Sequence, residues 1–194
     1  FKMKQIKPTF IALAALSAIA VICRFIPGRP YGFAPQLAIA VFCGALFATD
    51  KKWAFALTIG AMLFPDIVSE ILYKMHQTAM PGFYAGQWQN YLLFAGITCF
   101  GFLIKKIKPF NVLAVSLIAP TVYFLISNFL VWAGGGTDVY GIPYPKSVSG
   151  LLYCFTEALP FYRTSVEATI FFSMILFGGY YLIKQFNSTA FQKV

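Results

Sequence analysis

Charged residues are scarce in this chain, and their scarcity excludes an ordinary soluble domain. Only 11% of its 194 residues are Asp, Glu, Lys or Arg, whereas soluble domains carry about 25%. Hydrophobic residues make up 59% of the chain and aromatic residues 19%, and the mean hydropathy is +0.73. This composition is typical of an integral membrane protein. We expect residues 1–194 to form a single transmembrane domain, with no second, soluble domain.

Signatures of catalysis and of metal binding are also lacking. The chain has one histidine, His76, and four cysteines without CxxC or metal-ligand spacing. No HExxH, GxSxG or nucleotide-binding fingerprint occurs. We therefore expect no enzymatic activity, no metal and no cofactor. Cys23 and Cys154 fall near one predicted membrane face, so a disulfide between them stays open beside the alternative of inert thiols.

The basic residues do not form a nucleic-acid-binding face. The net charge is +9, but Lys and Arg are scattered between apolar runs. Charges distributed in this way orient a chain in a bilayer. We expect contact with membrane lipids and none with nucleic acid.

Six apolar segments approach the length needed to cross a hydrocarbon core of about 30 Å. The sequence predicts an all-α membrane protein, a bundle of six transmembrane helices over residues 9–26, 33–48, 53–73, 88–104, 110–133 and 164–183. Residues 151–161 are apolar around Glu157 but too few to span. We expect a short interfacial or re-entrant helix there, before the last span.

Residues 2–26 share features with a secretory signal peptide, namely a basic start, an apolar run and an AxA triplet at 18–20. The apolar run continues past the triplet to Ile26, so we expect a retained first span. Phe1 is not an initiator Met, and we expect the natural start to lie outside this sequence.

The distribution of Lys and Arg predicts the orientation of the chain. With a cytoplasmic N-terminus, ten of the fifteen basic residues fall on the inside and five on the outside. We therefore expect both termini in the cytoplasm.

That orientation gathers the polar side chains of the predicted spans near the outer surface. Asp66 and Glu70 are four residues apart and share one helix face. A carboxylate within a membrane helix is a functional-site hypothesis by default. The predicted substrate-binding site, a polar cup open to the outside, consists of Arg24, Asp66, Glu70, Asn128, Trp132, Arg163 and Glu167.

Several of these residues also have a purely structural interpretation. Glu70 can pair with Lys74 one helical turn away. Asp66 can form a buried pair with Arg24 or Arg163. Asn128 can hydrogen-bond a neighbouring helix, and Trp132 can belong to an interfacial aromatic belt.

Two further features concern partners and movement. Ala14 and Ala18 form a small-xxx-small pair, which lets another helix approach closely, either from a partner or within this bundle. The glycine run 134–136 permits hinge motion over the cup, or is a simple linker.

The first three predicted helices resemble a known family. The first relevant feature is the alanine-rich first helix, which ends in Arg24-Phe-Ile-Pro27. The others are the tripeptide Phe33-Ala-Pro35 and the run LAIAVFCGALFATDKKWAFALTIGAMLFPDIVSE at 37–70. They are similar to the substrate-binding S components of energy-coupling factor transporters. The SNF at 127–129 and LLYCFTEALPFYRT at 151–164 resemble an uncharacterised family of small bacterial membrane proteins related to them.

The resemblance implies a six-helix protein of the bacterial inner membrane, with both ends cytoplasmic and an outward site for a vitamin or metal. It implies that Ala14 and Ala18 meet a transmembrane coupling subunit, which works with ATPase subunits, and that the loop before the last helix closes over substrate. The histidine-bearing signature of nickel and cobalt members is absent, which argues against those metals. We therefore expect a membrane-embedded substrate-binding subunit of a small-molecule, vitamin-like importer. The alternative is an accessory structural subunit of a larger membrane complex.

Overall fold

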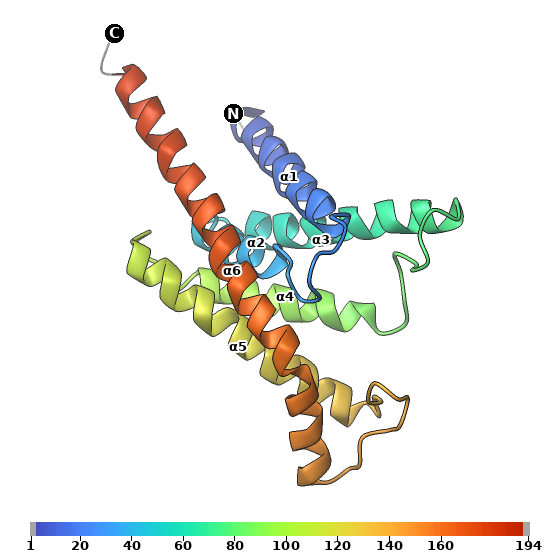
Figure 1. Cartoon of the computed structure of the whole chain (residues 1–194). Helices are drawn as coiled ribbons and strands as arrows, with labels where there is room; N and C mark the ends of the chain where they lie inside the picture. Colours follow the sequence, from blue (N-terminus) through green and yellow to red (C-terminus); the bar gives the residue numbers. More distant parts are fainter. Residues whose placement is uncertain (1–2, 192–194) are drawn as a thin grey trace.

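The computed structural model describes the backbone of residues 3–191 and the side chains of residues 11–185. Within that range the chain is helical, apart from one isolated β-bridge between Thr137 and Pro143. The predicted all-α class is confirmed. The helices (Figure 1) are α1 (Met3–Arg24), α2 (Gln36–Leu46), α3 (Lys51–Lys74), α4 (Gln87–Gly101), α5 (Pro109–Ala133) and α6 (Val148–Phe191).

Three of the described helices are long and apolar enough to cross a membrane, which indicates a membrane protein. They are α3, α5 and the part of α6 over Val148–Gln185. The other predicted spans are shorter than expected: α2 has 11 residues and α4 has 15. At about 1.5 Å per residue these two helices reach about 16 and 22 Å, less than the hydrocarbon core of about 30 Å.

The prediction of a separate short helix at 151–161 is wrong. Residues 151–161 and 164–183 belong to one continuous helix, α6, with Pro160 inside it. A proline within a helix removes one backbone hydrogen-bond donor and bends the helix, but the helix can continue beyond it. Pro65 in α3 and Pro120 in α5 lie inside helices in the same way.

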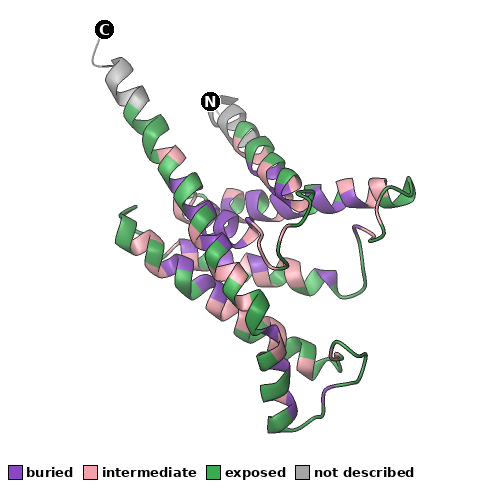
Figure 2. Ribbon diagram, in the orientation of Figure 1, coloured by how far each residue is buried: buried purple, intermediate pink, exposed green. Residues whose placement is uncertain are grey.

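Helix α2 forms the centre of the molecule. After its first residue, Gln36, the helix is apolar on all sides, as is typical of a buried helix, and seven of the eleven α2 residues are buried. Ala38, Ile39 and Cys43 pack in one core cluster with residues of α1, α3 and α6. Leu37, Ala40 and Val41 pack in a second with residues of α3, α4, α5 and α6. Figure 2 shows this buried centre where the helices cross.

Helices α2 and α4 approach each other through two glycines. A Cβ atom on Gly44 would lie 2.1 Å from the carbonyl oxygen of Thr98, and one on Gly101 would lie 2.3 Å from that of Val41. Next to this contact, the buried hydroxyls of Thr98 and Thr58 form a 3.1 Å hydrogen bond between α4 and α3. Small residues therefore allow backbone contact at the core.

The substitution Gly44→Ala is expected to destabilise the fold by about 1–3 kcal/mol, because its methyl group would overlap the backbone of α4. The matched control is Gly96→Ala in α4, where an added Cβ meets no atom within 4 Å. The measurement is the thermal unfolding midpoint in detergent, which should fall only for Gly44→Ala. Equal midpoints for the two variants would contradict the close contact.

Candidate functional site

Asp66 is the centre of the buried polar contacts at the end of α3. The residue is 6% exposed, and one of its carboxylate oxygens pairs with the guanidinium of Arg24 at the end of α1. A buried carboxylate is stable only when it is paired and its remaining oxygens accept hydrogen bonds. The structure therefore places the predicted residues Arg24 and Asp66 together, as the buried pair that was one of the sequence-based alternatives.

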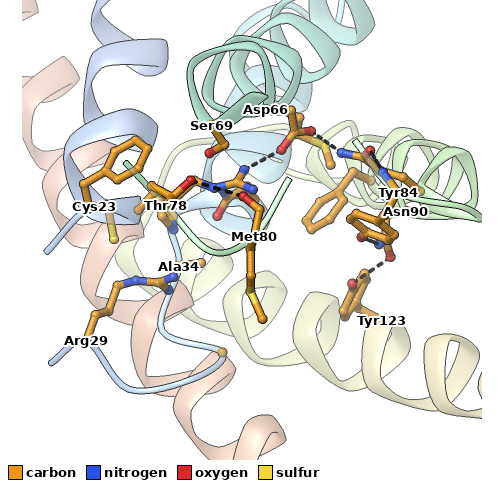
Figure 3. Close-up of a pocket in the computed structure, with 18 residues that line it drawn as sticks. Cys23, Arg29, Ala34, Asp66, Ser69, Thr78, Met80, Tyr84, Asn90 and Tyr123 are labelled. Carbon is orange, nitrogen blue, oxygen red and sulfur yellow. Dashed lines mark hydrogen bonds and ion pairs between the residues drawn. The ribbon is translucent and has the colours of Figure 1, made fainter. Parts of the chain in front are cut away.

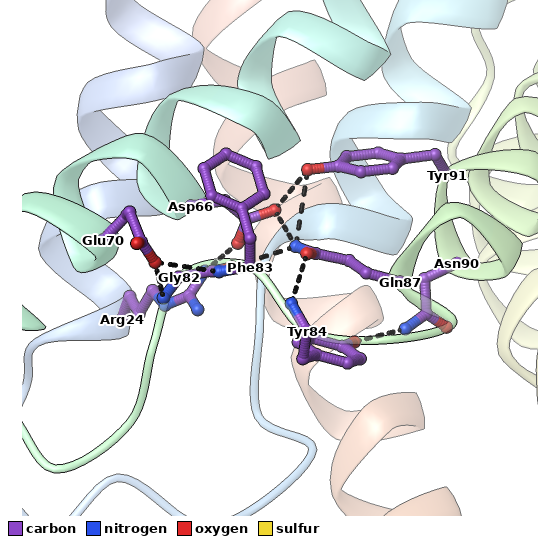
Figure 4. Close-up of polar contacts among 9 residues, drawn as sticks. All are labelled: Arg24, Asp66, Glu70, Gly82, Phe83, Tyr84, Gln87, Asn90 and Tyr91. Carbon is purple, nitrogen blue, oxygen red and sulfur yellow. Dashed lines mark hydrogen bonds and ion pairs between the residues drawn. The ribbon is translucent and has the colours of Figure 1, made fainter.

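The second carboxylate oxygen of Asp66 accepts hydrogen bonds from α4. Gln87 Nε2 and Tyr91 OH donate to Oδ2, each at 2.6 Å (Figure 4). Gln87 also donates to the carbonyl of Gly82 at 3.1 Å and accepts from the backbone N–H of Tyr84 at 3.2 Å. The Asp66 contacts thus join α1, α3, α4 and the loop between α3 and α4.

Glu70 holds the same loop one helical turn further along α3. Its Oε2 accepts from the backbone N–H groups of Gly82 at 3.1 Å and Phe83 at 3.4 Å. Its Oε1 lies 3.4 Å from Lys74 Nζ, the ion pair expected from their spacing. Gly82 lies against the helix backbone, since a Cβ there would be 1.9 Å from the carbonyl oxygen of Asp66.

A cavity of about 490 Å³ opens beside these contacts, within the usual range of about 300–1,000 Å³ for small-molecule sites. Figure 3 shows polar and apolar side chains converging on it from separate parts of the chain. Its lining comes from α1, the start of α2, α3, α4, α5 and the two loops at 25–35 and 75–86, and includes Arg24, Arg29, Gln36, Asp66, Ser69, Tyr84, Asn90 and Tyr123, with Phe25, Met62, Met80 and Phe94 as apolar surface.

Two polar atoms of this lining are buried without a hydrogen-bond partner. They are Nε of Arg29, a donor, and Oε1 of Gln36, an acceptor. Arg29 also donates through Nη1 to the carbonyl of Phe33, but it forms no ion pair with any side chain in the described range. Because a buried unsatisfied group costs about 1–3 kcal/mol, these atoms mark places where a bound molecule would be stabilised.

Glu70 and the other predicted site residues do not line the cavity. Asn128 and Trp132 lie near the end of α5, and Arg163 and Glu167 lie in the middle of α6. Asn128 donates to the carbonyl of Phe124 in its own helix at 2.8 Å. Trp132 donates to the carbonyl of Pro145 at 2.8 Å. Arg163 and Glu167 form an exposed pair at 2.9 Å on α6. The seven predicted residues therefore do not share one cavity. Asn128 and Trp132 contact the linker and the start of α6, which together form a second region.

The linker at 134–147 belongs to the second region. None of its residues lines the cavity, so the glycine run 134–136 does not lie over the Asp66 site (Figure 1). Tyr144 donates to Glu157 Oε2 at 2.5 Å, and Tyr153 donates to Oε1 at 3.0 Å. Burial, followed by the hydrogen bond to Glu157, raises the pKa of Tyr144.

Sequence reasoning missed several residues of the site. Gln87 and Tyr91 are four apart on α4 and share a face, a signal that could have paired them with Asp66 and Glu70. Arg29 was counted only as an outer charge. Gly82 and Phe83 act through their backbone N–H groups, for which the sequence carries no signal.

The comparisons with known proteins give one family. Residues 4–191 match the model described as "Family of unknown function (DUF6580)". The chain belongs to the DUF6580 family. No curated protein and no solved structure matches it.

The cavity of this DUF6580 protein is lined by basic, amide, hydroxyl and aromatic side chains beside Asp66. In the described part of the chain, no three His, Cys, Asp or Glu side chains gather closely enough to hold a metal ion. Cys23 lines the cavity as a free thiol, and Cys154 is free as well. What the cavity offers a ligand is positive charge, amide groups and aromatic surface.

The substitution Asp66→Asn is expected to destabilise the protein by about 3 kcal/mol, because it leaves Arg24 without its counter-charge. This is the low end of the usual range for breaking a buried pair, since the Arg24 side chain is 30% exposed. The measurement is the unfolding free energy in mixed micelles. The control, Glu167→Gln, breaks an exposed pair and should change stability by less than about 0.5 kcal/mol.

A double variant, Arg24→Met with Asp66→Asn, tests whether the two residues stabilise the protein as a pair or independently of one another. It should lose less stability than the two single variants together, because no uncompensated charge remains. Additive losses would contradict the buried pair.

Proposed function

We propose that this protein is the membrane-embedded substrate-binding subunit of an importer for a small, polar, vitamin-like molecule. The observation that carries the proposal is the cavity beside Asp66, with the unpartnered Arg29 Nε and Gln36 Oε1 in its lining. Cavities with a mostly apolar lining and a few convergent polar groups are the usual form of small-molecule sites.

The charges around the cavity favour an anionic ligand. Asp66 is compensated by Arg24, while Arg29 has no carboxylate partner among the described side chains. A carboxylate or similar acceptor group of the ligand would bind Arg29, and an N–H or O–H group would donate to Gln36. Tyr84, Tyr123 and Phe94 would contact an apolar or ring-shaped part of the same molecule.

Import also needs partners, because the sequence has no nucleotide-binding fingerprint. We place a transmembrane coupling subunit, with its ATPase subunits, against α1. Ala14 and Ala18 lie exposed on that helix and line a shallow apolar groove with Leu13, Val21 and Phe64. Small residues of this kind allow a close helix–helix contact.

The importer would lie in the bacterial inner membrane with both termini in the cytoplasm. In this arrangement all six helices lie in the bilayer, α3, α5 and α6 cross it in full, and the shorter α2 is enclosed by its neighbours. The cavity is on the outer side, because the ends of α1 and α3 and the start of α4 meet there. The excess of Lys and Arg in the opposite loops supports this orientation.

An accessory subunit of a larger membrane complex is the second candidate. The groove on α1 favours it. Ser17 lines this groove and is 4% exposed, and its buried hydroxyl has no hydrogen-bond partner among the described residues. A helix of another protein could supply the missing acceptor or donor.

The importer proposal predicts that protein purified gently from its native membrane retains a small molecule, observed by native mass spectrometry. Arg29→Gln and Gln36→Leu should each reduce the retained fraction about tenfold or more, because a hydrogen bond with a charged or buried partner is lost. Trp132→Phe, in the second region, is the control and should retain the wild-type amount.

Equal retention by all three variants would contradict a ligand at Arg29 and Gln36. Protein that carries no small molecule but copurifies with a stable set of membrane proteins would support the accessory subunit instead.

A further inference from the structure

A second cavity lies between α5 and α6, on the side of the molecule where α5 begins. This α5–α6 groove has a volume of about 630 Å³ and is lined by Ile107, Lys108, Pro109, Val112, Leu113, Ser116, Ile170, Ser173, Met174, Phe177, Gly178 and Tyr181. None of these residues lines the cavity at Asp66. In Figure 1 the two helices cross and then diverge toward the start of α5.

The inner surface of the groove is apolar. Its two serines, Ser116 and Ser173, are each 1% exposed and hydrogen-bond one another at 2.9 Å. They therefore offer no unsatisfied polar atom to an occupant. Gly178 leaves room beside them, since a Cβ there would meet no atom within 4 Å. Such a surface suits a hydrocarbon chain.

One end of the groove is strongly basic. Lys108 lines it directly, Lys105 and Lys106 precede it in the same short loop, and Lys184 follows Tyr181 by three residues on α6. None of these lysines forms an ion pair within the described residues. Because Lys108 immediately precedes the membrane-crossing helix α5, this charge lies where a bilayer presents its headgroups.

We propose that the α5–α6 groove binds one anionic phospholipid. An acyl chain lies along Leu113, Phe177 and Gly178, and the phosphate contacts Lys108. The charge at one end and the apolar surface behind it match an amphiphile with a negative headgroup.

The experiment is native mass spectrometry of the full chain, exchanged into micelles that contain equal amounts of phosphatidylglycerol and phosphatidylcholine with the same acyl chains. Phosphatidylglycerol should be retained preferentially. Lys108→Gln should reduce that preference about fivefold, since a basic residue near the headgroups contributes about 1 kcal/mol to anionic lipid binding. Lys52→Gln, which removes an exposed charge elsewhere, should leave the preference unchanged.

A second pair of variants tests the apolar part independently of charge. Gly178→Leu fills the groove and should reduce the retention of both lipids, while its neighbour Gly179→Leu, which does not line the groove, should retain them. Unfolding midpoints identify any variant that fails to fold, and Lys108→Gln, an exposed surface change, tests the proposal without that risk.

Four results would overturn the proposal. The first is equal retention of the two lipids by the wild-type chain. The second is equal lipid loss in Gly178→Leu and Gly179→Leu. The third is a dimer of this chain that Gly178→Leu disrupts, which would assign the groove to a second copy. Inorganic phosphate at the same concentration should not displace the lipid, and displacement would assign the basic end to a free anion.

Discussion

The structure depends on how one carboxylate, Asp66, is stabilised inside a membrane-crossing helix. An isolated charge in such a place is costly, and both oxygens of this carboxylate accept from protein donors. Arg24 occupies one oxygen, and Gln87 and Tyr91 occupy the other. These donors come from α1 and α4, so satisfying Asp66 fixes the ends of three helices relative to one another. For that reason, the wall of the adjoining cavity is held in place by contacts between these helices.

The buried helix α2 determines where such a cavity can form. It fills the centre with small and branched apolar residues, and Gly44 lets α4 touch its backbone. The cavity beside Asp66 and the α5–α6 groove lie where helices end or diverge: one at the ends of α1 and α3, the other where α5 and α6 separate. Their linings differ because polar residues gather at the first and apolar residues at the second.

The sequence was informative where a residue type is stable in only one kind of environment. Apolar composition predicted the helices, and a carboxylate in α3 predicted a site or a buried pair with Arg24 or Arg163, of which the structure forms the pair with Arg24. Asn128, Trp132 and Arg163 do not line the cavity, because membrane side alone does not specify lateral position. Gly82 and Phe83 could not be predicted, since their backbone N–H groups depend on loop geometry. The continuity of α6 through Pro160 depends on tertiary packing that overrides a local signal.

The contacts of Asp66 also change the role assigned to it. An oxygen that already accepts short hydrogen bonds from Gln87 and Tyr91 has little capacity left for a ligand. Arg29 and Gln36 are in the opposite state, with buried atoms that lack partners. On one wall of the cavity the charge of Asp66 is therefore compensated by Arg24. Elsewhere in the lining, Arg29 Nε and Gln36 Oε1 have no hydrogen-bond partner. In the proposed site Asp66 would position the helices and the loop, and ligand recognition would rest with Arg29 and Gln36, two residues outside the helices that are long enough to cross a membrane.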